Sequence, residues 1–372
     1  MPEQSIYEDI RAETYPADYP SGWYHLFDVD ELRPGKVMRI DALGKHLVAF
    51  RGKDSGAIHV LDAHCPHQGA HLAAGGRVEG DCIRCPFHNW GFDGEGRLAD
   101  IPGLEKLPRA RINSYPVREH YKMLWMYHDV SGQRVEAPYE PELHPDVDAG
   151  GLVYRGRYAP RDVRMHISEF IENSVDFQHF AVLHNEVTIP WTRVKIPGMG
   201  IQHDAGWELD EARPHVAYFA DYAYLTVGKK HLHKSGAHAK ITLFGPGSTV
   251  WFRFTLPDLG DVLMFQTHLP TGPLNQRVRF HWWADRKVPR ALAWYVVGHW
   301  ISQWKADIEV WENKIMRDRP VLVRLDGPVH KMRRWVRQFY TPSQVGEARG
   351  QRVAALDRRA EAPAVAVAKD AV

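Results

Sequence analysis

Two short segments carry cysteine and histidine at spacings that suit an iron–sulfur centre. Cys65 and His67 form a Cys-x-His pair, and Cys85 and His88 form a Cys-x-x-His pair further along the chain. Two thiolates can bind one iron of a [2Fe–2S] cluster while two imidazoles bind the other. Imidazole donates less charge than thiolate, so such a cluster has a reduction potential of about −150 to +300 mV, above that of plant-type ferredoxins. The pattern predicts one-electron transfer.

Zinc is the main alternative for this motif, because Cys82-x-x-Cys85 alone would fit a zinc half-site. Three features favour a Rieske [2Fe–2S] cluster instead. The second ligand of each pair is histidine, and proline follows both cysteines, as Pro66 and Pro86. The second loop also continues into 89–96, a turn-rich stretch that can fold back over a cluster.

Outside this ligand set, Cys82 is interpreted as a small buried residue, and His64 and His71 as neighbours of the first loop. The chain has three cysteines, all within 65–85, which leaves none for a disulfide elsewhere. This usage and the polar segment 1–19 predict a cytoplasmic protein. A net charge of +1 offers no basic field for nucleic acid, and we expect no transmembrane segment.

A second metal site is indicated by two histidines five residues apart, His179 and His184. On an ideal helix they would point about 140° apart, so they can share a metal only if the helix widens or ends between them. A one-electron donor in the same chain needs a reaction centre to receive its electrons. An Fe(II) ion bound by two histidines and one carboxylate is the natural candidate. The carboxylate candidates lie on one predicted helix, and spacing does not choose among Asp307, Glu309 and Glu312.

The elements that must position these residues fall into two regions. Many short strands are predicted over 22–130, with the cluster loops inside them and a Pro-rich linker at 136–145. A helical pattern follows over 167–184. The later predicted elements are strands at 241–245, 249–255, 262–269 and 277–283 and a helix over 289–314.

Alternation in the later strands predicts a sheet with one packed face and one that lines something else. Aromatic residues between Trp251 and Trp283 suit either a pocket for a flat polycyclic lipid or an ordinary core. We expect a Rieske domain at 22–130, a catalytic domain at 131–344 and a disordered tail at 345–372.

The cluster loops followed by Asn-x-x-Asp-x-x-His-x4-His resemble the oxygenase component of Rieske non-haem iron oxygenases, and the resemblance covers 23–340. It implies an α+β fold, in which an N-terminal all-β Rieske domain precedes a C-terminal helix-grip (START-like) antiparallel-sheet catalytic domain. It also implies that His179, His184 and Asp307 bind the mononuclear iron.

The same resemblance implies roles for two residues that precede the histidines. Asn173 would lie close to the iron. Asp176 would bridge the iron ligand His179 to a cluster histidine of a neighbouring subunit, plausibly His88, in a ring that is usually a trimer.

A narrower resemblance is to the sterol and steroid branch, which contains 3-ketosteroid 9α-hydroxylase oxygenases and Neverland-type cholesterol 7-desaturases. The first cluster loop has proline between cysteine and histidine, where many aromatic-ring dioxygenases have arginine. Residues 185–240 match no pattern that we can assign. The other segments that carry the resemblance are 307–314, Pro320, 326–328 and 334–340.

These observations predict a terminal oxygenase that uses a [2Fe–2S] cluster, mononuclear Fe(II) and O₂ to hydroxylate or desaturate a sterol- or steroid-like substrate. No G-x-G-x-x-G motif occurs, so a separate NAD(P)H-dependent reductase or ferredoxin must supply electrons. The alternatives are a Rieske monooxygenase for a smaller aromatic or amine substrate, a free Rieske electron carrier, and a zinc-binding module.

Overall fold

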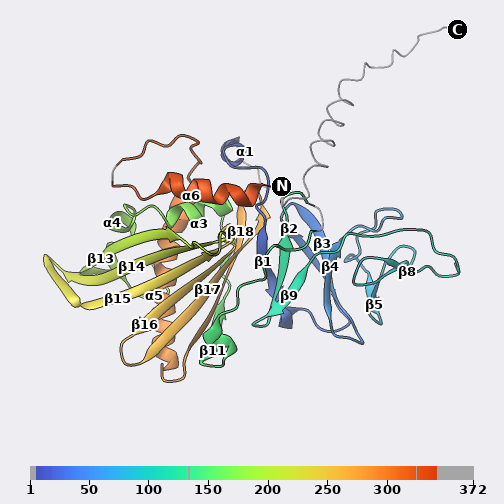
Figure 1. Cartoon of the computed structure of the whole chain (residues 1–372), viewed down its shortest axis with the longest axis horizontal. Coiled ribbons are helices and arrows are strands. Elements are labelled where there is room, and N and C mark those ends of the chain that lie inside the picture. Colours follow the sequence, from blue (N-terminus) through green and yellow to red (C-terminus); the bar gives the residue numbers. More distant parts are fainter. Residues whose placement is uncertain (1–5, 133–134, 324, 342–372) are drawn as a thin grey trace, which may run out of the picture.

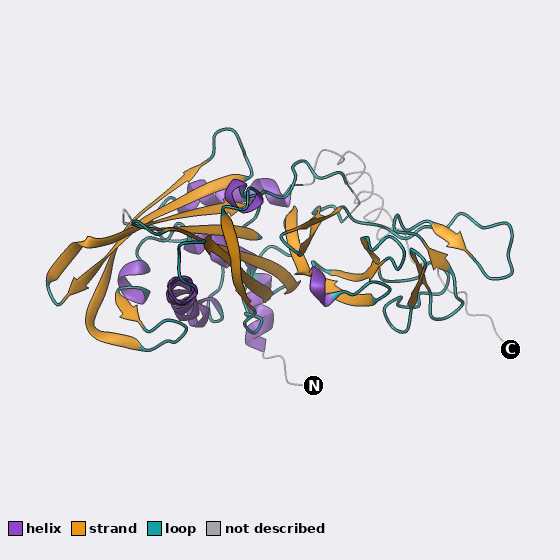
Figure 2. Ribbon diagram, turned by 90° about the horizontal axis from the view of Figure 1, so that it is seen from below, coloured by secondary structure: helices purple, strands orange, loops and turns teal. Residues whose placement is uncertain are grey.

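The computed structural model describes residues 6–132, 135–323 and 325–341, so the tail predicted at 345–372 lies outside the described residues. Two lobes lie along the long axis of the molecule (Figures 1 and 2). Among the described residues, no helix has the length and apolar character needed to cross a membrane.

The N-terminal lobe consists of three small antiparallel sheets, which confirms the predicted all-β region. The first has the strand order β1 (Gly22–Asp28), β10 (Met123–His128), β9 (Val117–His120). The second is β2 (Val37–Ala42), β3 (Lys45–Arg51), β4 (Ile58–Asp62). The third is β5 (Arg77–Glu79), β6 (Cys82–Arg84), β7 (Gly91–Phe92), β8 (Leu98–Asp100), and a short 3₁₀ helix, η1 (Val29–Glu31), follows β1.

The C-terminal lobe is built on one eight-stranded antiparallel sheet. Its strand order is β11 (Leu152–Tyr158), β18 (Asn275–Asp285), β17 (Gly260–Gly272), β16 (Thr249–Leu256), β15 (Lys230–Phe244), β14 (Val216–Val227), β13 (Lys195–Leu209), β12 (Glu186–Thr188). The long helix α5 (Arg290–Trp311) lies behind the strands in Figure 1. The other helices are α1 (Ile6–Glu13), α2 (Pro145–Asp148), α3 (Ile167–Asn173), α4 (Phe180–Leu183), α6 (Val329–Val336) and the 3₁₀ helix η2 (Arg337–Tyr340).

The two faces of the large sheet are buried against different partners. Phe252 and Phe280 point to the face that packs on α5, in one core with Trp304. The alternate residues, such as Trp251 and Trp283, form a separate core with aromatic residues of β1 and β10. The face with Phe252 also lines a cavity, so it is the face expected to line something else, and the N-terminal lobe packs on the opposite face.

The prediction of one continuous helix over 167–184 is wrong, because the structure has two short helices there. The Ser174 hydroxyl donates to the Ile171 carbonyl, which competes with continued helix pairing as α3 ends. The Asp176 carboxylate then accepts the backbone N–H groups of Gln178 and His179, which begins the turn that becomes α4.

Candidate active site

The two cluster loops share one backbone geometry. In each, the cysteine N–H donates to the carbonyl five residues later, and the cysteine carbonyl accepts the N–H four residues later. That fourth residue has a positive φ in both loops, 75° at Gly69 and 60° at Asn89. Glycine and asparagine tolerate this conformation best, so each loop can turn sharply directly after its cysteine and histidine.

The side chains of these loops form a set that fits a [2Fe–2S] cluster. Cys65 and Cys85 are each 2 % exposed and belong to one core, whereas His67 and His88 are exposed. The two imidazole rings lie 4.6 Å apart between centroids. Burial, together with the Cys85 side chain, raises the pKa of the Cys65 thiol to about 11, so iron must displace a proton to bind there. The exposed imidazole side is where an electron can enter or leave.

The neighbouring cysteine and histidines lie outside this set. Cys82 pairs with Glu79 in the β5–β6 hairpin. The His64 ring donates to the Gly69 carbonyl at 3.0 Å, and the His71 ring accepts a backbone N–H of its own loop. Both hydrogen bonds lie within the first loop and stabilise its conformation.

The second histidine pair meets a carboxylate in the C-terminal lobe. His179 and His184 stand at the two ends of α4, so the short helix ends before it can turn them apart. Nε2 of His184 is 3.0 Å from Oδ1 of Asp307 on α5. One ligand atom from each of the three residues lies within 4.8 Å of the others. The structure thus brings together the three residues that the sequence resemblance selects.

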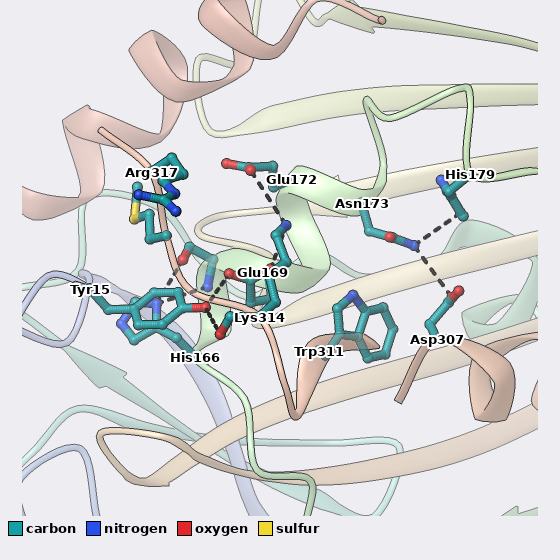
Figure 3. Close-up of polar contacts among 12 residues, drawn as sticks. Tyr15, His166, Glu169, Glu172, Asn173, His179, Asp307, Trp311, Lys314 and Arg317 are labelled. Carbon is teal, nitrogen blue, oxygen red and sulfur yellow. Dashed lines mark hydrogen bonds and ion pairs between the residues drawn. The ribbon is translucent and has the colours of Figure 1, made fainter. Parts of the chain in front are cut away.

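The environment of this trio fits a metal ion. Oδ1 of Asp307 is buried and has no hydrogen-bond partner. The Asn173 amide lies between the other two residues, with Nδ2 3.3 Å from Nε2 of His179 and 3.4 Å from Oδ2 of Asp307 (Figure 3). Burial lowers the pKa of His179, which favours the neutral imidazole that metals bind. Two neutral imidazoles and one carboxylate suit Fe(II) with open coordination positions.

Each histidine is oriented through its other ring nitrogen. Nδ1 of His184 donates to Oε1 of Gln303 at 2.6 Å, and Nδ1 of His179 contacts the backbone carbonyl of Asp176. Both contacts leave Nε2 free to bind a metal. The sequence interpretation missed Gln303, although its position four residues before Asp307 places both on one helix face.

The observed contact between Asp176 and His179 differs from the one that we expected. The ring N–H of His179 was predicted to meet the Asp176 carboxylate, but it faces the backbone carbonyl instead. The carboxylate accepts the backbone N–H of His179, the residue that precedes the first turn of α4, and it is only partly buried. One carboxylate oxygen, Oδ1, accepts both N–H groups, so Oδ2 remains for another partner.

The other two carboxylate candidates on α5 and its end face away from the histidines. The Glu309 side chain is 80 % exposed. Glu312 instead forms an ion pair with Arg161 at 2.7 Å.

A buried polar network fixes α5 against α3 close to the trio (Figure 3). Nζ of Lys314 is 2.7 Å from Oε2 of Glu169, and the Tyr15 hydroxyl donates to the other carboxylate oxygen at 2.6 Å. Arg11 donates to the Trp311 carbonyl at 2.8 Å. These contacts tie the N-terminal segment, α3 and the end of α5 together, and the sequence interpretation missed them.

An apolar cavity of about 390 Å³ opens on the trio. Its walls come largely from strands within 185–240, the region that sequence patterns left unassigned, and from α5. No lysine or arginine is among its lining residues in the part of the chain that the structure describes. The main apolar lining residues are Phe170, Phe180, Ile201, Phe219, Leu225, Ile241, Leu243, Phe252, Phe254, Leu256, Val296 and Trp300.

Two family models match the chain. The Rieske [2Fe-2S] domain matches residues 22–116, and the 3-ketosteroid 9alpha-hydroxylase C-terminal domain matches residues 126–340. Cholesterol 7-desaturase nvd 1 of Ciona intestinalis is 33% identical over 88% of this chain and 70% of its own length. A probable 3-ketosteroid-9-alpha-monooxygenase oxygenase component of Rhodococcus rhodochrous is 30% identical over 89% of this chain and 82% of its own.

Solved structures share the fold at lower identity. Dicamba monooxygenase bound to dicamba is 17% identical, with a TM-score of 0.57 over 87% of this chain and 98% of that one. NdmB of Pseudomonas putida CBB5 is 19% identical, with a TM-score of 0.61 over 90% of this chain and 91% of that one.

Replacing Gln303 tests how the second centre is oriented. Gln303→Leu removes the acceptor for the Nδ1 proton of His184, so we expect Fe(II) to bind about 10- to 100-fold more weakly. Gln303→Glu keeps an acceptor oxygen and should bind Fe(II) close to the parent affinity. Titration of Fe(II) into each variant, with its [2Fe–2S] cluster intact, measures the two affinities. Equal, unchanged affinities in the two variants would show that Gln303 does not orient the histidine.

Proposed function

The chain belongs to the Rieske oxygenases with a 3-ketosteroid 9alpha-hydroxylase type of C-terminal domain, and we propose that it oxidises a C–H bond of a sterol- or steroid-like substrate. It would do so as the terminal oxygenase of a multicomponent system. The outcome would be hydroxylation or desaturation, decided by which substrate hydrogens face the metal.

The proposed cofactor ligands follow from the two sets of side chains described above. Cys65, His67, Cys85 and His88 would hold the [2Fe–2S] cluster. The trio of His179, His184 and Asp307 would hold the mononuclear iron. Bound there, the iron would activate O₂, which is the oxidant for C–H cleavage, and the cluster would supply the electrons that the reaction needs.

The apolar cavity is the main observation that supports a sterol- or steroid-like substrate. Its volume of about 390 Å³ lies within the roughly 300–1,000 Å³ typical of small-molecule sites. Aliphatic and aromatic side chains line most of it, so its favourable interaction with a ligand is burial of apolar surface. A rigid polycyclic hydrocarbon with few polar groups gains most from such walls.

A smaller charged substrate fits the same cavity less well. An aromatic acid needs a cationic partner when it leaves water, and the described lining offers no lysine or arginine. An amine would need a free carboxylate. Asp221 lines the cavity with its Oδ2 2.8 Å from Nδ1 of His203, so only its Oδ1, which has no hydrogen-bond partner, is available to a polar group of a substrate.

The residues beside the metal trio have separable tasks. Asn173 contacts both His179 and Asp307 through its amide, at 3.3 and 3.4 Å, and adds no charge because the amide is neutral. Gln303 and the backbone of Asp176 hold the two imidazoles in one tautomer. The apolar walls exclude water, which protects a reactive site from side reactions.

The electron source is a separate protein in this proposal. The chain has no dinucleotide-binding motif, so an NAD(P)H-dependent reductase or a ferredoxin would dock near the exposed His67 and His88. Phe87 beside them is 59 % exposed and would supply apolar contact area. We place the whole system in the cytoplasm.

Electron delivery to the iron is proposed to cross between subunits. Figures 1 and 2 place β5–β8, which flank the cluster loops, and α4 at opposite ends of the molecule. A head-to-tail ring, proposed to be a homotrimer, would bring the cluster of one chain beside the iron of the next. Asp176 would link the two, because its free Oδ2 can accept a ring N–H of the neighbour's cluster histidine, proposed to be His88.

Product analysis tests the substrate class. The protein, reconstituted with Fe(II), a surrogate reductase and NADH, should convert cholesterol or a 3-ketosteroid to a product changed by +16 or −2 mass units. Benzoate-like acids and aryl amines serve as the comparison set. Turnover of the small charged compounds, with none of the sterols or steroids, would contradict the proposal.

Asp176→Asn tests the route between subunits. The amide keeps its oxygen as a cap for α4 but loses the negative charge that would hold a histidine of the next subunit, so turnover should fall at least about 100-fold. Both metal centres and the oligomer should persist. Stopped-flow absorption should show a reduced cluster that fails to reoxidise with substrate and O₂. A normal rate in the variant, or a fully active monomer, would rule this route out.

A further inference from the structure

A second buried group of histidine and aspartate side chains lies where the two lobes meet. His25 and Asp28 belong to β1 of the N-terminal lobe, and His281 belongs to β18 of the C-terminal sheet. All three residues are 2–5 % exposed. Oδ1 of Asp28 is 3.1 Å from Nε2 of His25 and 2.9 Å from Nε2 of His281. No substrate cavity or cluster loop described above includes any of them.

These three converging atoms do not satisfy one another. Oδ1 of Asp28 and Nε2 of both histidines are buried and lie 2.9–3.1 Å apart, but they form no hydrogen bond of good geometry. Buried polar atoms that approach so closely without a hydrogen bond are costly unless another group stabilises them. A simple hydrogen-bonded His–Asp–His cluster would aim both N–H groups at the carboxylate.

The proposed iron site has the same arrangement of two histidine nitrogens and one carboxylate oxygen. Only two groups of three such ligand atoms within 4.8 Å occur in residues 6–132, 135–323 and 325–341: the trio with Asp307, and this one. In both, a histidine Nε2 lies about 3 Å from a carboxylate Oδ1 that lacks a hydrogen bond. Ligands bound tetrahedrally at about 2.0–2.1 Å are about 3.3 Å apart, so the observed separations are close to those of ligands around one ion.

The surroundings orient His25 and Asp28 as they would orient metal ligands, whereas Nδ1 of His281 is buried without a hydrogen-bond partner. Nδ1 of His25 lies 3.1 Å from the Thr267 hydroxyl, and a hydrogen bond donated there leaves the Nε2 lone pair directed inward. Arg157 donates to the outer oxygen, Oδ2 of Asp28, at 2.5 Å, which fixes the carboxylate while Oδ1 stays free. Arg157 also pairs with Asp30 at 3.0 Å, so a second carboxylate offsets its charge.

We propose that His25, Asp28 and His281 form a structural binding site for a divalent cation of the zinc class. Two imidazoles and a carboxylate are ligands that zinc accepts, and none of the three residues lines the substrate cavity, so the ion would act on structure rather than on the substrate. The ion would join β1 directly to the large sheet through β18. It would thus fix the N-terminal lobe, and the cluster that it carries, against the lobe that holds the substrate cavity.

Metal analysis of purified variants tests this site. Wild-type protein grown with iron and zinc, then dialysed against Zn²⁺ and desalted, should contain one zinc per chain beside its iron. His281→Gln should lose that zinc and keep its iron. Asp307→Ala, the matched control at the other site, should lose one iron and keep the zinc. X-ray absorption at the zinc edge should show two histidine nitrogens at about 2.0–2.1 Å.

Two outcomes would overturn the proposal. One is wild-type protein that holds no zinc after dialysis against Zn²⁺. The other is zinc that survives in His281→Gln but leaves with Asp307→Ala, which would place the ion in the iron site. If His281→Gln does not fold, the zinc-edge spectrum of Asp307→Ala decides, because the other two-histidine site is disrupted there: two histidine neighbours support the site, and zinc without histidine neighbours contradicts it.

Discussion

A buried carboxylate without a cationic side chain is the constraint around which the C-terminal lobe is built. Asp307 is 5 % exposed, and the only ion-pair partner that the described residues give it is His184. A charge in this position is costly unless a cation balances it. The nearby polar groups, the Asn173 amide and two imidazoles, add no fixed positive charge. A divalent metal ion supplies what this arrangement lacks, and the same ion is what oxygenase chemistry requires.

The large sheet explains how one lobe can hold the substrate and also anchor the other lobe. Alternate residues along its strands serve two separate cores, with Phe252 facing the cavity and α5, and Trp251 facing the N-terminal lobe. Substitutions on one face therefore act on substrate binding, and those on the other act on how the lobes pack. The group formed by His25, Asp28 and His281 lies at this second interface.

Sequence reasoning selected the candidate ligands because their residue types are chemically specialised. Two matched Cys/His loops and a His-x4-His pair stand out without knowledge of packing. It could not choose Asp307 from spacing alone, because the choice depends on which face of α5 meets α4. It also missed the cavity walls within 185–240, whose long strands do not alternate strictly between apolar and polar residues. Gln303, Glu169 and Lys314 escaped notice because their roles exist only through long-range contacts.

Iron counting on two variants of α5 tests the central claim most directly. Asp307→Ala should reduce iron from about three to about two per chain while the visible spectrum of the cluster persists, because only the mononuclear ion loses a ligand. Glu309→Ala, on the exposed face of the same helix, should keep about three. An Asp307→Ala protein that retains about three irons, or a Glu309→Ala protein that loses one, would contradict the account.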